Sequence, residues 1–225
     1  MEILCVYCGQ RATTSDHVPP KSFYLLPLPP NIKTVPSCYK CNNSQSKDEA
    51  YTALMFGTAT DCGINNEFGR KFWDQRGQKA LKRNRSLNAA VFQTMHKIDV
   101  WSGKIIIGQT PCFRPNMGLI LRVVSKIVRG LFYLENGRSL NYNAHIFVRP
   151  LSRIKPNDAL SFIYKQFSLA PIREVGSGAL CYKTLNAYDG EDDSIWFLKF
   201  QGDVVPETFH VKEQSNRNNH LYRSG

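Results

Sequence analysis

The sequence predicts an α+β protein made of a small metal-bound N-terminal module and a larger α+β body. Two cysteine pairs with the same C-x-x-C spacing fall within the first 41 residues, which indicates a metal-held module. Farther along, short alternating apolar segments are mixed with helix-like segments, and 225 residues with 42% hydrophobic content suffice for a core. We expect the module at residues 1–56, the body at 57–213 and a polar tail at 214–225.

The cysteine pairs are Cys5 with Cys8 and Cys38 with Cys41. Because a two-residue gap lets both sulfurs of a pair turn onto one ion, this spacing predicts a structural zinc site with four thiolate ligands. The alternative, four unrelated buried thiols, leaves the equal spacing unexplained. No secretory signal is evident at the N-terminus, so paired thiols also favour a reducing, cytoplasmic environment.

The module begins with an expected strand at residues 2–8, followed by a second at residues 13–18. Residues 19–30 are rich in proline, which lacks a backbone donor, so we expect a loop over the surface there. A third short strand is expected at residues 32–35. A helix should follow Cys41, because Ser46 and Glu49 have the spacing of a capping box.

In the body, residues 67–95 are rich in Arg, Lys, Gln and Ala and predict one or two basic helices. Residues 98–107 predict a hairpin turned at Ser102 and Gly103. We also expect a strand at residues 144–148 and a helix at residues 158–167. Residues 180–188 and 195–200 predict a second hairpin, joined by an acidic turn.

Residues 117–136 show helical periodicity and end at Gly137, a residue common just after helices. Arg122, Lys126 and Arg129 recur at helical spacing, which predicts an amphipathic surface helix. These charges interrupt the longest apolar stretch of the chain, so no transmembrane segment is expected.

Asp16 and His17 lie between the cysteine pairs, in the segment Asp-His-Val-Pro-Pro-Lys, and Asn42 directly follows Cys41. This arrangement resembles the HNH (ββα-metal) endonucleases, in particular the zinc-stapled kind typified by phage junction-resolving enzymes. The Asp-His-Val-Pro-Pro-Lys and Ser-Lys-Asp-Glu segments are also similar to a group of uncharacterised bacterial HNH proteins. The resemblance covers about the first fifty residues and implies two strands and a helix around one metal.

By this resemblance, His17 is the general base, since an imidazole can accept a proton from water at neutral pH. Asp16 and Asn42 would bind a catalytic cation, and their hard oxygen ligands suit Mg²⁺ or Mn²⁺. Asn31 matches the middle asparagine of the motif and would brace the loop, although it fits an ordinary turn residue nearly as well. Asn43 competes with Asn42 as the ligand, but Asn42 abuts the cysteine as the pattern requires.

The formal charge of +11 is concentrated downstream of this motif. Between residues 70 and 149, fifteen Lys and Arg face only three Asp and Glu, whereas residues 1–50 and 151–225 are nearly balanced. Solvated helix faces would account for such a run, but next to an apparent phosphodiesterase motif it favours a track for a phosphate backbone. The densest cluster consists of Arg76, Lys79, Lys82, Arg83 and Arg85.

These patterns together predict a metal-dependent HNH endonuclease that hydrolyses phosphodiester bonds in nucleic acid, most plausibly DNA. The alternative is a zinc-ribbon protein that binds nucleic acid without cutting it. A third interpretation makes the nuclease an effector in a defence system or toxin, with the C-terminal body recognising a protein partner or forming a homodimer. The joint presence of Asp16, His17 and Asn42 favours the enzyme, because a binding module does not need them.

Overall fold

The computed structural model describes residues 2–58, 67–150, 167, 169–186, 193–200 and 209–214. These residues form a mixture of helices and strands, as the predicted α+β class requires. No helix among them is long and apolar enough to cross a membrane.

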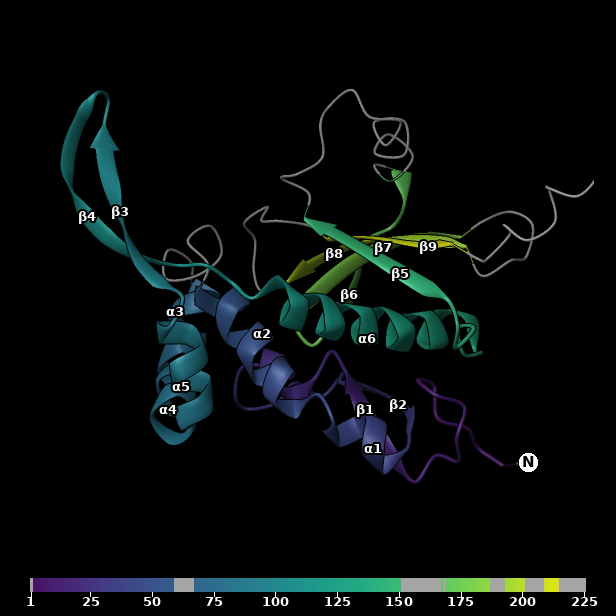
Figure 1. Ribbon diagram of the computed structural model, residues 1–225. Coiled ribbons are helices and arrows are strands. Elements are labelled where there is room, and N and C mark those ends of the chain that lie inside the picture. Colours follow the sequence, from purple (N-terminus) through teal and green to yellow (C-terminus); the bar gives the residue numbers. More distant parts are fainter. Residues whose placement is uncertain are drawn as a thin grey trace, which may run out of the picture.

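Helix α6 (Met117–Asn136) is the central element of the fold. The side chain of Asn116 caps its N-terminus, and Gly137 ends it in the left-handed conformation, as predicted. Figure 1 shows α6 running between a five-stranded sheet and the N-terminal strands β1 and β2. The prediction of a surface helix was therefore wrong, because neighbours on both sides bury residues around most of its circumference.

The five-stranded sheet is antiparallel throughout, in the order β5-β9-β8-β7-β6. Its strands are β5 (His145–Pro150), β6 (Arg173–Val175), β7 (Leu180–Asn186), β8 (Ser194–Phe200) and β9 (Phe209–Gln214). Alternate residues of β8, among them Trp196 and Leu198, are fully buried, so one face of the sheet contributes to the core. The predicted hairpin of β7 and β8 is confirmed, whereas β6 and β9 were not predicted.

The N-terminal module contains an antiparallel pair of strands, β1 (Thr14–Val18) and β2 (Lys33–Ser37). Two helices follow, α1 (Tyr39–Asn43) and α2 (Ser46–Thr58). The strand expected at residues 2–8 was wrong: this segment turns back on itself and keeps only an isolated bridge between Leu4 and Arg11. A straight strand would point Cys5 and Cys8 to opposite faces, whereas a turn brings their sulfurs together.

The proline-rich segment after β1 was expected on the surface but enters the core. Phe23, in a short 3₁₀ turn (Lys21–Phe23), is fully buried and packs against Phe56 of α2 and Phe200 of β8, with ring centroids 6.2 and 5.6 Å away. Tyr24 is also fully buried. These apolar side chains bury enough surface to draw a segment without regular backbone pairing into the interior.

One hydrophobic core joins the module to the body. It includes Val18 of β1, Val35 of β2, Val123 of α6 and Trp196 of β8. Helix α6 comes very close to β1 at Gly130, where an added Cβ would lie 2.5 Å from Val18 Cγ2. The predicted boundary after residue 56 falls inside α2.

Beyond α2, the chain forms a helical region and a projecting hairpin. The helices are α3 (Glu67–Phe72), a π-helical turn (Trp73–Gly77), α4 (Gln78–Arg83) and α5 (Arg85–Phe92). The hairpin consists of β3 (Met95–Ser102) and β4 (Ile105–Phe113), which are longer than the predicted strands but turn at the predicted place. The predicted helix at residues 158–167, except for Phe167, and the tail from residue 215 lie outside the described residues.

Candidate metal centre and polar site

The four paired cysteines come together at the base of the module. Their sulfur atoms all lie within 4.8 Å of one another, and the Sγ atoms of Cys8 and Cys38 are 3.7 Å apart. A tetrahedral zinc ion with bonds of about 2.3 Å would place its sulfur ligands about 3.8 Å apart. The cluster could therefore hold a structural metal ion such as zinc.

Local backbone geometry positions both cysteine pairs. In the first, the Cys5 N–H donates to Gln10 O and the Gly9 N–H donates to Cys5 O, with Gly9 at a φ of 74° that favours glycine. In the second, Cys38 caps helix α1 and its sulfur accepts the Cys41 N–H at 3.4 Å. Both pairs are thus shaped by short-range hydrogen bonds.

The backbone around Cys5 also favours ionisation of its thiol. Burial opposes the charged form, but hydrogen bonds from the backbone of Cys38, Tyr7 and Cys8 outweigh it and lower the pKa of Cys5 to about 7. Thiolates are the form that binds metal. Burial instead raises the pKa of Cys8 and of Cys41, so a bound ion would have to displace their protons, whereas the set of four thiol donors itself fits a zinc ion.

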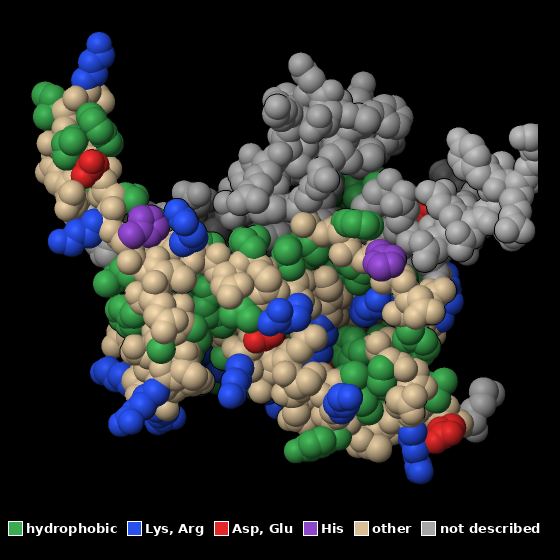
Figure 2. All heavy atoms as spheres, viewed as in Figure 1, with side chains coloured by type: hydrophobic (Ala, Val, Ile, Leu, Met, Phe, Trp, Pro, Cys, Tyr) green, Lys and Arg blue, Asp and Glu red, His purple; other side chains and the backbone are tan. Residues whose placement is uncertain are grey.

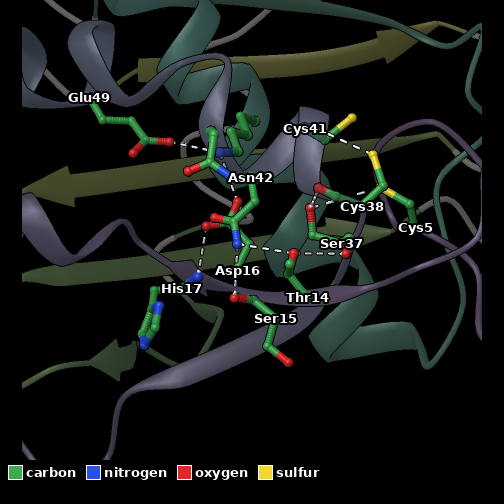
Figure 3. A network of polar contacts seen from close by, with 12 residues as sticks. Cys5, Thr14, Ser15, Asp16, His17, Ser37, Cys38, Cys41, Asn42 and Glu49 are labelled. Carbon is green, nitrogen blue, oxygen red and sulfur yellow. Dashed lines mark hydrogen bonds and ion pairs between the residues drawn. The ribbon is translucent and has the colours of Figure 1, made fainter.

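Strand β1 presents Asp16 and His17 to opposite sides. Asp16 is buried, at 5% exposure, whereas His17 is half-buried. Figure 3 shows the His17 ring turned away from the Asp16 carboxylate, which accepts the His17 backbone N–H at Oδ1, 2.9 Å away. Because side chains alternate along a strand, the two neighbours point to opposite sides.

Helix α1 brings Asn42 onto the same strand. The Asn42 amide Nδ2 donates to Thr14 Oγ1 at 3.1 Å and to Ser15 O at 3.2 Å, directly before Asp16. Asn43, the competing candidate, is exposed, and its amide donates to Tyr39 O within its own helix. Of the two asparagines, only Asn42 lies beside Asp16.

Asn31, the middle asparagine of the motif, is exposed in the turn before β2. It precedes the first residue of β2, Lys33, and therefore lies at the opposite end of that strand from Cys38. The structure does not bring Asn31 together with Asp16 and Asn42.

A buried lysine completes the surroundings of Asp16. Lys126 Nζ, from α6, lies 2.7 Å from Asp16 Oδ2 and 2.7 Å from Glu49 Oε1, as the dashed lines in Figure 3 show for the two acids. The same ammonium lies 5.3 Å from the centre of the Tyr7 ring. Lys126 is only 6% exposed, so these three charged groups form an internal ion triad.

The triad has a consistent electrostatic signature. Burial would lower the pKa of Lys126, but hydrogen bonds and charge from Asp16 and Glu49 outweigh it and raise that pKa. Burial raises the pKa of Glu49, with Lys126 opposing it. Burial and the nearby Asp16 carboxylate also raise the pKa of the Tyr7 phenol. Lys126 is therefore protonated and supplies the positive charge of the triad.

Sequence reasoning missed Lys126 and Glu49. Lys126 was assigned to a solvated stripe and Glu49 to a helix cap, whereas each reaches into the interior to form the triad. A signal was present, because Lys126 lies next to Ile127 and three residues after Val123, among the apolar positions of the helix. A lysine on an apolar face needs an acidic partner.

The other two basic residues of that helix have different roles. Arg122 is exposed and forms an ion pair with Asp48 of α2 at 2.9 Å. Arg129 donates to the backbone oxygens of Asn141 and Ala144, at 3.0 and 2.8 Å, and so fixes the chain that leaves α6. Lys126, by contrast, contacts the predicted catalytic residue Asp16.

This arrangement bears on the expected catalytic cation. Asp16 is buried, one of its oxygens accepts the His17 N–H and the other lies against the Lys126 ammonium. The Asn42 amide group donates to β1. As they are arranged here, Asp16 and Asn42 do not fit a Mg²⁺ or Mn²⁺ ion, because the ammonium already occupies the space facing the carboxylate.

His17 has the electrostatics of a proton acceptor. Burial and the positive charge of Lys21 lower the pKa of His17, and the Asp16 carboxylate only partly opposes them. The imidazole is therefore neutral at pH 7, the form that can take a proton from water. Lys21 is the exposed lysine of the Asp-His-Val-Pro-Pro-Lys segment and places a cation near the base.

A groove lies beside the triad and the cysteine cluster. Its volume is about 410 Å³, and it lies between one side of α6 and the end of α1 with the link to α2. Its lining residues include three cations and no carboxylate: Tyr7, Cys41, Ser44, Gln45, Leu121, Arg122, Ser125, Lys126 and Arg129. Two of these cations are paired with carboxylates, Lys126 with Asp16 and Glu49 and Arg122 with Asp48, so the groove carries less positive charge than its lining residues alone suggest.

The predicted basic cluster lies elsewhere. Lys79, Lys82 and Arg83 are exposed on α4, and Arg85 is exposed at the start of α5. Arg76 differs from them, because it is half-buried and burial lowers its pKa. Figure 1 shows these helices apart from β1 and β2, so the structure does not bring the cluster together with His17.

The exposed part of this cluster can be tested by a salt series. Replacing Lys79, Lys82 and Arg83 with Gln is expected to weaken DNA binding equally on all sequences. The slope of log affinity against log salt should flatten by about two to three units, since each phosphate contact contributes about −0.9. Binding by protein carrying His17→Ala, with and without the triple change, gives the measurement. Equal slopes would show that the phosphate track lies elsewhere.

Comparisons with known proteins identify no family for this chain, so any assignment of function rests on its own residues. No protein-family model matches the chain, and no curated protein or solved structure matches it significantly.

Proposed function

We propose that this protein hydrolyses phosphodiester bonds in nucleic acid, most plausibly DNA, as an endonuclease of the HNH type. The observation that carries the proposal is that Asn42 of α1 hydrogen-bonds to the strand that bears Asp16 and His17, beside a four-cysteine cluster. Asn42 donates to the Ser15 carbonyl and Asp16 accepts the His17 N–H, so both fix the backbone from which His17 projects, while burial and Lys21 favour its neutral imidazole.

His17 accepts a proton from the attacking water. The oxygen of that water bonds to phosphorus, one phosphorus–oxygen ester bond breaks, and the leaving oxygen takes up a proton from solvent. Lys21 contributes positive charge near the imidazole, where a phosphate would approach. A divalent cation, if the reaction uses one, requires a different arrangement of Asp16 and Lys126 from the one described.

The zinc ion in this proposal is structural. Cys5, Cys8, Cys38 and Cys41 would supply all four ligands, which leaves no open position for water or substrate. The ion would fasten the first turn to α1 and thereby set the position of Asn42 against β1.

A second function has one specific observation in its favour. Because Lys126 holds Asp16 in a buried ion triad, the motif could serve only to pack α6 against the module. The protein would then bind nucleic acid through its basic surfaces without cutting it. Cleavage assays separate the two proposals.

Purified protein should nick supercoiled plasmid or cut single-stranded DNA or RNA, and His17→Ala should abolish that activity with zinc content and fold unchanged. Cleavage should decline as the pH falls, with a midpoint below the ordinary imidazole pKa of about 6.5, because burial and Lys21 lower the pKa of His17 and only the neutral ring accepts a proton. Lys21→Gln should move the decline to higher pH. Parallel reactions with Mg²⁺, Mn²⁺ and EDTA test the need for a cation.

His96→Ala is the matched control, since His96 is exposed on β3, outside the motif, and its removal should leave cleavage unchanged. Wild-type activity in the His17→Ala protein would remove His17 from its assigned role. Nucleic-acid binding without cleavage under any of these conditions would favour the second function.

A further inference from the structure

The hairpin of β3 and β4 projects from the body as a two-stranded arm (Figure 1). Strand β3 is exposed along its whole length. Figure 2 shows hydrophobic side chains along the arm, with charged groups among them. A two-stranded hairpin is only marginally stable in water, and within the described part of the chain no third strand pairs with this one. Each outer edge of the arm therefore keeps a row of unpaired backbone N–H and C=O groups.

The two edges differ in how open they are to another strand. Strand β4 is bulged, because its register shifts opposite the step from Val100 to Trp101 and leaves Ile107 as an extra residue. It also contains Pro111, which has no backbone N–H to donate. Bulges and prolines are features that prevent an edge from pairing. Strand β3 has neither of them and no glycine, so its edge is the open one.

The side chains of β3 do not form an apolar face. They alternate between two faces: Met95, Lys97, Asp99 and Trp101 on one, and His96, Ile98 and Val100 on the other. Each face therefore mixes apolar and polar groups. A strand that pairs with β3 has to match this alternation residue by residue.

Two opposite charges on one face, Lys97 and Asp99, decide which strand fits the edge. Charged residues on an edge normally repel a further strand. Here the two charges flank Ile98, so an antiparallel copy of β3 centred on Ile98 places Lys97 of each copy opposite Asp99 of the other. Opposite charges at facing positions stabilise a strand pair. Asp99 keeps one oxygen for this contact, because the Gln109 amide donates to its Oδ1, 2.9 Å away.

The register centred on Ile98 also matches the apolar side chains. It places Trp101 of each copy opposite Met95 of the other, and these side chains are 58% and 47% exposed in the single chain. It places Ile98, which is also exposed, opposite its own copy beside the two-fold axis. Facing side chains of this kind bury each other's surface.

Other antiparallel registers of β3 are less favourable. Facing residues must share a face, so the register can be centred only on a residue and not between two residues. Centring it on Lys97 or on Asp99 would set like charges directly opposite each other, which destabilises a sheet. Centring it on His96 or on Val100 would shorten the overlap of the two strands.

We propose that the open edge of β3 binds the β3 edge of a second copy, which gives an antiparallel four-stranded sheet in the order β4-β3-β3-β4, centred on Ile98. Two pairs of Lys97 with Asp99 fix its register. A four-stranded sheet has the stability that an isolated hairpin lacks. The two bodies lie at opposite ends of this sheet. This interface is independent of whether the N-terminal site cuts nucleic acid.

A disulfide beside the two-fold axis tests the register. In the proposed sheet the Cα atoms of residue 98 and its copy lie about 4.5–5.5 Å apart, within reach of a disulfide. Ile98→Cys protein should therefore form a covalent dimer with oxidised glutathione, in a Cys112→Ser background that removes the thiol of β4. Val100→Cys is the matched control, because Val100 shares that face but lies about 13 Å from its own copy. It should crosslink no more than the Cys112→Ser protein.

A charge exchange tests the two ion pairs by rescue. Asp99→Lys sets lysines opposite each other and should weaken the dimer at least about tenfold in sedimentation velocity. Adding Lys97→Asp restores opposite charges in the same register and should restore the dimer. Both proteins lack the bond between Asp99 and Gln109, so loss of that bond cannot explain a difference between them.

Wild-type protein should approach twice the 25.6 kDa mass of the chain as its concentration rises from about 1 to 100 µM. A wild-type protein that stays a single chain throughout this range overturns the proposal, and so does absence of the Ile98→Cys crosslink. A dimer that crosslinks equally at positions 98 and 100, or that Asp99→Lys leaves equally tight, is formed by a different surface and overturns it as well.

Discussion

Loss of zinc is expected to unfold the N-terminal module. The segment before β1 has no strand pairing beyond an isolated bridge, and besides a few backbone hydrogen bonds and the burial of Val6, the cysteine cluster fastens it to α1. Zinc binding in comparable four-ligand modules contributes about 10–16 kcal/mol at neutral pH. Elemental analysis should therefore find about one zinc per chain, and a chelator should cause loss of secondary structure.

Cys8→Ser tests the cluster, and Cys112→Ser is the matched control, because Cys112 is a half-buried free thiol on β4, outside the cluster. The first change should remove zinc and lower the melting temperature sharply, whereas the second should leave both almost unchanged. Protein that folds equally well with and without zinc would contradict the structural role of the cluster.

Lys126→Met is expected to destabilise the protein by about 3–5 kcal/mol, since it leaves Asp16 and Glu49 buried without their counter-ion. The deficit should shrink as the pH is lowered, because burial already raises the pKa of Glu49 and loss of Lys126 removes the opposing influence. A protonated Glu49 no longer needs the ammonium. Chemical denaturation of wild-type and variant protein across a pH series gives the measurement.

Arg122→Met is the matched control for this prediction. Arg122 lies one helical turn before Lys126 and also pairs with a carboxylate, that of Asp48, but at an exposed position. Its loss should cost no more than about 1 kcal/mol. Adding Glu49→Gln to Lys126→Met should restore part of the lost stability, because one buried charge is then removed. Equal stability of the Lys126→Met and Arg122→Met proteins would show that the triad contributes little.

Patterns confined to a few neighbouring residues were predicted well. The hairpin turned at Gly103 and helix α6 ended at Gly137 because a left-handed glycine is recognisable from its flanking segments. The cysteine spacing likewise predicted a cluster whose sulfurs do approach one another. The strand predicted at residues 2–8 was wrong for a related reason. An apolar run beside a metal-binding turn has the same local composition as a strand.

The candidate site was predicted only in part. Asp16, His17 and Asn42 are close in the sequence to the cysteines, and the structure has Asp16 and His17 on β1 with Asn42 of α1 hydrogen-bonded to that strand. Lys126 is separated from Glu49 by 77 residues, so no local pattern could reveal the contact between them. The sequence shows the charge of Lys126, but it does not show which residues surround that side chain.

The sequence by itself determined the cysteine cluster, the motif on β1, the ends of α6 and the excess of positive charge, because each depends on residue type and short-range spacing. The tertiary structure decided where those elements lie relative to one another. Packing α6 between the sheet and the module buried Lys126 against Asp16, and contacts with Phe56 of α2 and Phe200 of β8 buried Phe23. A side chain's burial and its pKa depend on neighbours from distant segments, and only the folded chain brings those segments together.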